Sequence, residues 1–187
     1  MTGKTHQLFA LIAVLGAAAV WMPHVSSIGV ALLCLIAAMF GAWTPDIDHS
    51  AARLWTQFPA GSLVGRLVRI VLGGHRNVSH SILGGLLVIW LTRHIFDILK
   101  PEVLADAHLI WMAYLIGFFS HLASDTITDH GIPWFWPLAI NIGLPPGPPI
   151  FRITTGSHVE LHILRPILMV GIGLLFLRLF PFLRAIW

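Results

Sequence analysis

The chain contains few charged residues. Lys, Arg, Asp and Glu together make up 10% of its 187 residues, whereas soluble domains carry about 25%. Hydrophobic residues make up 57%, too many for so few charged side chains to screen from water. The composition therefore excludes a soluble domain and indicates an integral membrane protein.

Cysteine is almost absent as well. The single cysteine, Cys34, lies in an apolar stretch, which excludes a disulfide framework and a cysteine-based zinc module. The net charge of +3 is small, and the basic residues form no stripe interleaved with aromatic residues. We therefore expect no nucleic-acid partner.

Five apolar segments are candidates for membrane-spanning helices, which need about 20 residues to cross a bilayer. They are Leu8–Trp21, Val25–Trp43, Ile82–Ile98, His108–Ala123 and Leu161–Phe182. We predict an all-α membrane helical bundle of four to five spans, in a single domain over residues 1–187. The first segment has an alternative interpretation as a cleaved signal peptide, because a basic residue precedes the apolar run and Ala17–Ala19 resembles a cleavage site.

Two further segments lie between the predicted spans. Gly61–Leu72 places two arginines on one side and apolar residues on the other, a pattern typical of an amphipathic helix in the membrane interface. Asp129–His158 is rich in Pro, Gly and Trp and is predicted to form an ordered loop, either a lid or a fixed wall. Trp134 and Trp136 are predicted to anchor this loop among the lipid headgroups.

Histidine is unusually frequent, with 11 residues, as many as Lys and Arg combined. Alternate spans reverse direction, so the start of an odd-numbered span and the end of an even-numbered span lie on the same membrane face. Most histidines and carboxylates therefore gather at one end of the bundle, where ionisable residues indicate a functional site. These residues are His6, Asp46, Asp48, His49, His75, His80, His121, Asp125, Asp129, His130, His158, Glu160 and His162.

This polar set matches the ligands of a divalent metal. Histidine and carboxylate without cysteine suit Zn²⁺, Mn²⁺ or a related ion. His121 and Asp125 are four residues apart and share one helix face. The set exceeds what one four-coordinate ion needs, so we predict two or three divalent metal ions, zinc or alternatively manganese. Such sites hydrolyse phosphoesters by activating water.

Each motif also has a simpler interpretation. His121 and Asp125 could form a hydrogen-bonded pair at a helix end, and Asp46-Ile47-Asp48 could be a helix stop. The convergence of the motifs favours the metal site. Four histidines are interpreted as interfacial side chains outside it: His24, His94, His108 and His162.

The motif order resembles the YdjM family of inner-membrane metal-dependent hydrolases. The matching blocks, between His6 and Glu160, are Pro45–His49 (PDIDH), Gly74–Ser81 (GHRNVSHS) and Gly117–Asp125 (GFFSHLASD). The resemblance implies a multi-pass protein of the inner membrane whose metal site is lined by His6, Asp46, Asp48, His49, His75, His80, His121, Asp125 and Glu160. The chain departs from the family at Asp129-His130, where a proline is common, which implies extra polar ligands or a different turn.

A more distant likeness concerns the ligand order, which is similar to that of the zinc phospholipase C and single-strand nuclease superfamily. Those enzymes are helical and act on phosphodiesters at a three-zinc site. The likeness implies phosphoester chemistry, and a site that opens at the membrane surface favours a lipid substrate.

We therefore predict a membrane-bound metal-dependent hydrolase that cleaves a phosphoester of a membrane phospholipid or lipid-linked substrate. Asp46 or Asp48 is the predicted general base. Arg76 is the predicted phosphate-binding residue, with Lys4 and Arg152 as further candidates. Two alternatives stay open: a carrier of metal ions or protons, and a non-catalytic scaffold with a structural metal site. No oligomeric state is predicted.

The distribution of basic residues predicts the orientation in the membrane. The site face carries Lys4, Arg53, Arg66, Arg69, Arg76, Arg152 and Arg165, and the other face carries Arg93, Lys100, Arg178 and Arg184. By the positive-inside rule, the site face is predicted to be cytoplasmic.

Overall fold

The computed structural model describes residues 1–21, 24–48, 55, 61–71, 77–98, 106–138 and 140–185. Over these residues the chain is helical and contains no β-strand, which confirms the predicted all-α class. The α-helices are α1 (Gly3–Trp21), α2 (Ile28–Trp43), α4 (Gly61–Val71), α5 (Ile82–Ile98), α6 (Ala107–Thr126) and α7 (Arg165–Ala185). Short helical turns lie at Pro45–Asp48, Val78–His80, Pro149–Phe151 and Val159–Leu164.

Four helical segments in this part of the chain are long and apolar enough to cross a membrane. They are Gly3–Trp21, Ile28–Asp48, Ala107–Thr126 and Val159–Arg184. Ile82–Ile95 is a shorter apolar helix, so the prediction of four to five spans is confirmed. α1 begins at Gly3, so the first span includes the buried Thr5 and His6 ahead of the apolar segment that starts at Leu8.

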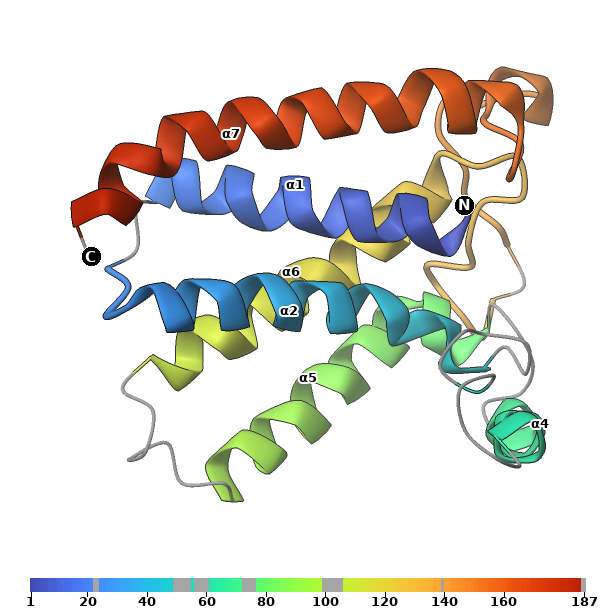
Figure 1. The fold of residues 1–187 in the computed structure, drawn as a ribbon. Coiled ribbons are helices and arrows are strands. Elements are labelled where there is room, and N and C mark those ends of the chain that lie inside the picture. The colour runs from blue at the N-terminus through green and yellow to red at the C-terminus, as the bar shows by residue number, and fades with distance from the viewer. Residues whose placement is uncertain are drawn as a thin grey trace.

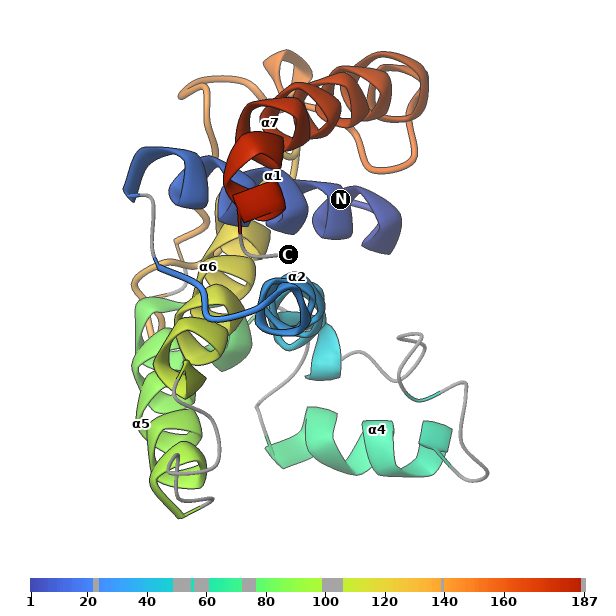
Figure 2. The ribbon, with the colours of Figure 1, turned by 60° about the vertical axis from the view of Figure 1, so that its left-hand side comes forward.

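Helices α1, α2 and α6 form the centre of the bundle (Figure 1). α7 packs against α1, and α5 lies beside α6, as the turned view in Figure 2 shows. α2 and α6 cross where glycines face the partner backbone: a Cβ atom would lie 2.0 Å from Tyr114 O at Gly41 and 1.9 Å from Ala38 O at Gly117. Glycine permits this close crossing, which brings the end of α2 next to the last turns of α6.

α4 lies across the spans. Figure 1 shows it end-on, whereas α1, α2 and α7 run lengthwise. Its exposed side chains include the apolar Leu63, Leu67 and Ile70 as well as Arg66. Its direction and its mixed surface match the amphipathic interfacial helix that the sequence predicts for Gly61–Leu72.

The segment between α6 and α7 is an ordered loop, as predicted. Ile132 and Ile142 exchange backbone hydrogen bonds of 3.1 and 2.9 Å, and Ile132 is buried against Phe118 of α6. The indole N–H of Trp134 donates to Thr126 Oγ1 at 2.9 Å, which ties the loop to the end of α6. The anchoring of Trp134 and Trp136 among the headgroups stays a prediction. These contacts fix the base of the loop on the bundle and favour a fixed wall over a lid.

Candidate metal centre

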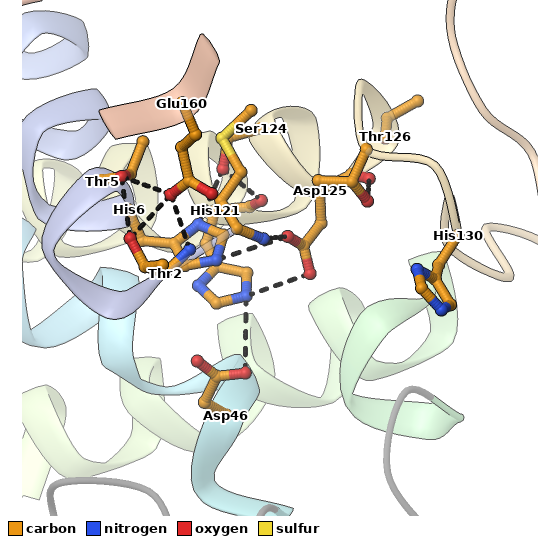
Figure 3. A network of polar contacts seen from close by, with 12 residues as sticks. Thr2, Thr5, His6, Asp46, His121, Ser124, Asp125, Thr126, His130 and Glu160 are labelled. Atoms are coloured by element: carbon orange, nitrogen blue, oxygen red, sulfur yellow. Dashed lines mark hydrogen bonds and ion pairs between the residues drawn. The ribbon is translucent and has the colours of Figure 1, made fainter. Parts of the chain in front are cut away.

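Five of the predicted ligands meet at the end of the bundle where α1 begins and α6 ends. This His–Asp cluster consists of His6 on α1, Asp46 in the turn after α2, His80 in the turn before α5, and His121 and Asp125 on α6. Figure 3 shows Asp46 approaching the others from the side opposite Glu160. The three histidines and Asp125 are buried, whereas the Asp46 side chain is 31% exposed. The cluster is therefore enclosed by protein except at Asp46.

The donor atoms of the His–Asp cluster converge. His121 Nε2 lies 3.7 Å from both Asp46 Oδ1 and Asp125 Oδ2. His80 Nε2 lies 3.6 Å from Asp125 Oδ2 and 3.3 Å from His121 Nε2, and His6 Nε2 lies 3.3 Å from Asp125 Oδ1. Ligands bound tetrahedrally to zinc at about 2.0–2.1 Å lie roughly 3.3 Å apart, so the observed separations are close to those of a metal site.

The hydrogen bond behind His121 determines which ring nitrogen carries the hydrogen. His121 Nδ1 lies 2.7 Å from the backbone oxygen of Ala42 on α2. A carbonyl oxygen only accepts hydrogen bonds, so Nδ1 must donate. In the neutral ring, Nε2 then carries a lone pair, and this lone pair faces the carboxylates of Asp46 and Asp125.

His6 is oriented in the same way by a serine. Ser124 donates its hydroxyl hydrogen to His121 O at 2.8 Å, so its oxygen is left to accept the hydrogen of His6 Nδ1 at 2.7 Å. His6 Nε2 therefore also presents a lone pair to Asp125. The rings of His6 and His121 stack with their centroids 3.6 Å apart.

His80 is held through Ser79 and Asp48. The Ser79 hydroxyl donates to Asp48 Oδ2, and its oxygen lies 2.9 Å from His80 Nδ1, where it accepts the ring hydrogen. Asp48 is fully buried. Asp48, a predicted ligand, therefore acts on His80 through Ser79. From this position it orients the His80 ring, as carboxylates do for metal-binding histidines.

A cation between the converging acceptors would relieve the repulsion among them. Imidazole lone pairs and carboxylate oxygens repel one another at 3.3–3.7 Å unless positive charge lies between them. The Met1 amino group supplies one positive charge by pairing with Asp125 Oδ1. The donor set and its spacing fit a divalent metal, because each ligating histidine has its second nitrogen hydrogen-bonded by protein.

Glu160 lies outside the His–Asp cluster and holds the start of α1 in place. Its carboxylate accepts hydrogen bonds from Thr2 N at 2.8 Å, Thr5 Oγ1 at 2.5 Å and Gly156 N at 2.7 Å. It sits in a π-helical turn that directs the side chain inward. The resemblance implies that Glu160 lines the metal site, and its contacts favour a role in orienting His6 over a role as metal ligand, since Thr5 precedes His6.

His49, His75 and Arg76 lie outside the described residues. Lys4 is exposed. The Arg152 guanidinium donates to the backbone oxygens of Pro145, Gly147 and Asp129, so it stabilises the loop.

Asp129 and His130 bind each other rather than the cluster. His130 Nδ1 lies 2.6 Å from Asp129 Oδ1, and its ring is 72% exposed, apart from the cluster in Figure 3. Burial alone would raise the pKa of the Asp129 carboxyl, but hydrogen bonds from His130 outweigh it and lower the pKa below its ordinary value.

Sequence reasoning missed the residues that orient the ligands. Ser79 precedes His80 and Ser124 precedes Asp125, so both stand inside the motifs that supplied the ligands. Their position next to a metal-binding residue was the available signal, because ligating histidines regularly donate their second N–H to a neighbouring acceptor.

Comparisons with known proteins agree with the resemblance in the motifs. The chain is 30% identical over 160 residues to the uncharacterized protein YvsG of Bacillus subtilis, covering 86% of this chain and 85% of that protein. It is 27% identical over 153 residues to the inner membrane protein YdjM of Escherichia coli, covering 78% and 70%. No solved structure matches the chain. The profile described as "YdjM inner membrane protein" matches residues 1–186, and the chain therefore belongs to the YdjM inner membrane protein family.

Proposed function

We propose that this inner-membrane protein is a metal-dependent hydrolase that cleaves a phosphoester of a membrane phospholipid or lipid-linked substrate. The observation that carries the proposal is the orientation of His6 and His121. Their Nδ1 hydrogens are held by Ser124 and Ala42 O, which leaves the Nε2 lone pairs directed at two carboxylates. Buried side chains arranged in this way are ready to bind a cation without further rearrangement.

The donor set suits zinc, with manganese as the alternative, because nitrogen and oxygen donors are combined without cysteine. Two groups of three ligands have donor atoms within 4.8 Å of one another: His6, Asp46 and His121, and His80, His121 and Asp125. The groups share His121, whose single Nε2 lone pair binds one ion. A second ion would therefore draw on His49 or His75. A bound divalent ion lowers the pKa of water from about 15.7 to about 7 and so supplies hydroxide at neutral pH.

Asp46 is the proposed general base. It is the exposed carboxylate of the His–Asp cluster, whereas Asp48 is buried and accepts the Ser79 hydroxyl. A proton taken up by Asp46 can leave to solvent, while one on Asp48 would break the support of His80. The substrate phosphate would approach from the side of Asp46, and Arg76 keeps its proposed role of binding the phosphate oxygens.

The position of the cluster supports a lipid substrate. Three of the four candidate spans contribute to it: α1 through His6, Ile28–Asp48 through Asp46, and α6 through His121. The cluster lies at the ends of these spans, at the level where phosphoester groups of a bilayer are found. Basic residues on the same end favour the cytoplasmic face, and accessibility of a cysteine introduced at Lys4 to impermeant reagents in inverted vesicles would test this orientation.

The direct test compares metal content and turnover in matched variants. Asp46→Asn should bind less zinc or manganese and lose hydrolysis of fluorescent phospholipids while eluting as the unsubstituted protein does. Asp97→Asn is the control, because Asp97 pairs with Arg93 on the exposed surface of α5, away from the cluster. Protein that contains no metal after chelator-free purification would refute the proposal.

The same variants separate the alternatives. A carrier predicts metal or proton uptake into proteoliposomes that Asp46→Asn abolishes, without phosphoester turnover. A scaffold with a structural metal predicts that Asp46→Asn unfolds the protein, since closed coordination contributes folding energy. The partly exposed Asp46 side chain favours the hydrolase over the scaffold.

A further inference from the structure

The loop that follows α6 carries an exposed apolar surface. From Gly131 to Phe151 the chain has no charged residue, yet the segment contains no α-helix. Six of its large apolar side chains are exposed, between 50% for Leu144 and 85% for Ile150. We call these side chains the loop ridge: Phe135, Leu138, Ile140, Leu144, Ile150 and Phe151.

The backbone of this segment has few hydrogen-bond donors for its length, and most of these are paired. Its prolines have no N–H group, and they occupy positions 133, 137, 145, 146, 148 and 149. Most other donors bond within the segment or to the end of α6, including Leu138 N to Phe135 O at 3.0 Å and Leu144 N to Thr126 O at 2.8 Å. Each paired donor lowers the cost of holding this non-helical backbone at the headgroup level, above the hydrocarbon core that lipid-exposed loops do not enter.

Arg152 supplies partners for the carbonyl groups. Its Nε donates to Pro145 O at 3.1 Å and its Nη2 donates to Gly147 O at 2.9 Å. The guanidinium thereby satisfies two carbonyl acceptors in the proline-rich turn. Arginine placed next to an apolar segment also suits the headgroup level of a membrane.

The loop ridge is continuous with the lipid-facing surface of the bundle. Trp134 O accepts the N–H of Ile82 at 2.9 Å, which joins the loop to the first turn of α5, where Ile82 and Leu83 are exposed. On the other side, Val159 and Ile163 are exposed at the start of the last span. In a chain that spans the membrane, these neighbours face lipid.

We propose that residues 131–151 form a membrane-immersed loop whose ridge inserts among the acyl chains just below the headgroups, in the leaflet at the end of the His–Asp cluster. The partner is the bilayer itself. The loop would place lipid next to the cluster, because it begins six residues after Asp125. This inference does not depend on the hydrolase proposal, since an immersed loop would serve a carrier or a scaffold equally.

Depth-dependent quenching tests the proposal. Single cysteines are introduced as Ile150→Cys and Leu138→Cys in a Cys34→Ala background, labelled with an environment-sensitive fluorophore and studied in full-length protein in phosphatidylcholine–phosphatidylglycerol vesicles. Thr155→Cys is the aqueous control, since Thr155 is exposed on the same loop beyond the ridge, and Leu174→Cys on α7 is the lipid control. The unsubstituted chain, labelled in parallel, shows how far Cys34 reacts.

We expect labels at positions 150 and 138 to show blue-shifted emission and stronger quenching by shallow doxyl lipids than by aqueous iodide, as at Leu174 and unlike Thr155. Iodide quenching equal to that at Thr155 would overturn the proposal. Protection from both quenchers would also overturn it, because it would mean that a second copy of the chain covers the ridge. As a second measurement, Ile150→Asp should reduce the quenching at position 138 by shallow doxyl lipids, and Thr155→Asp should not.

Discussion

Replacing Ser124 with alanine tests the orientation of the metal ligands most directly. Ser124 Oγ accepts the Nδ1 hydrogen of His6 and donates to His121 O. Without it, the His6 ring can carry its hydrogen on Nε2, which then cannot bind a metal. Loss of the partner behind a ligating histidine typically lowers metal affinity by about 10- to 100-fold, which corresponds to about 1.4–2.7 kcal/mol.

Competition with a chromophoric chelator on the detergent-solubilised protein measures this change. Ser120→Ala is the matched control: Ser120 lies one turn earlier on α6, and its hydroxyl donates to Gly117 O at 2.7 Å. Ser124→Thr keeps a hydroxyl and should recover most of the affinity. If Ser124→Ala and Ser120→Ala bind zinc equally well, the argument from the tautomers is refuted.

Three further predictions concern stability. Gly117→Ala should lower the midpoint of thermal unfolding, because the new Cβ would lie 1.9 Å from Ala38 O and overpacking costs about 1–3 kcal/mol. Gly173→Ala is the control and should leave the midpoint unchanged, because open space surrounds Gly173. Equal midpoints for the two variants would contradict the close crossing of α2 and α6. Glu160→Gln should lower the free energy of unfolding by about 1.5–3 kcal/mol, as expected for hydrogen bonds to a charged group, and should speed proteolysis of α1. Unchanged proteolysis would argue against the role of Glu160 in anchoring α1. Removal of zinc by a chelator should lower the free energy of unfolding by about 2.7 kcal/mol, relative to protein with free zinc at a hundred times Kd. Adding zinc back should restore the midpoint of thermal unfolding. A midpoint that changes neither on removal nor on re-addition of zinc would speak against a metal in the cluster.

The ligands could be predicted from the sequence because their grouping depends on coarse topology. The alternation of span direction alone puts His6, His80 and His121 on one face, and no distance is needed for that conclusion. The five ligands that meet in the structure were all among the residues at these span ends.

Glu160 and Asp48 mark the limit of that reasoning. Both are buried carboxylates at the predicted end of the bundle, yet the structure surrounds them with hydrogen-bond donors from Thr5 and Ser79. Whether a carboxylate meets a metal or a hydroxyl depends on shifts of about one rotamer, which spacing in the sequence does not encode.

The spread of the ligands along the chain sets the order of events during synthesis. His6 precedes Asp125 by 119 residues, so during synthesis the chain holds an incomplete set of the proposed ligands until α6 has been inserted. For the proposed metal centre, metal loading would therefore follow the insertion of α1, α2, α5 and α6. The Glu160 contacts with Thr2 and Thr5 form later still, so the centre closes only when the last span is in place.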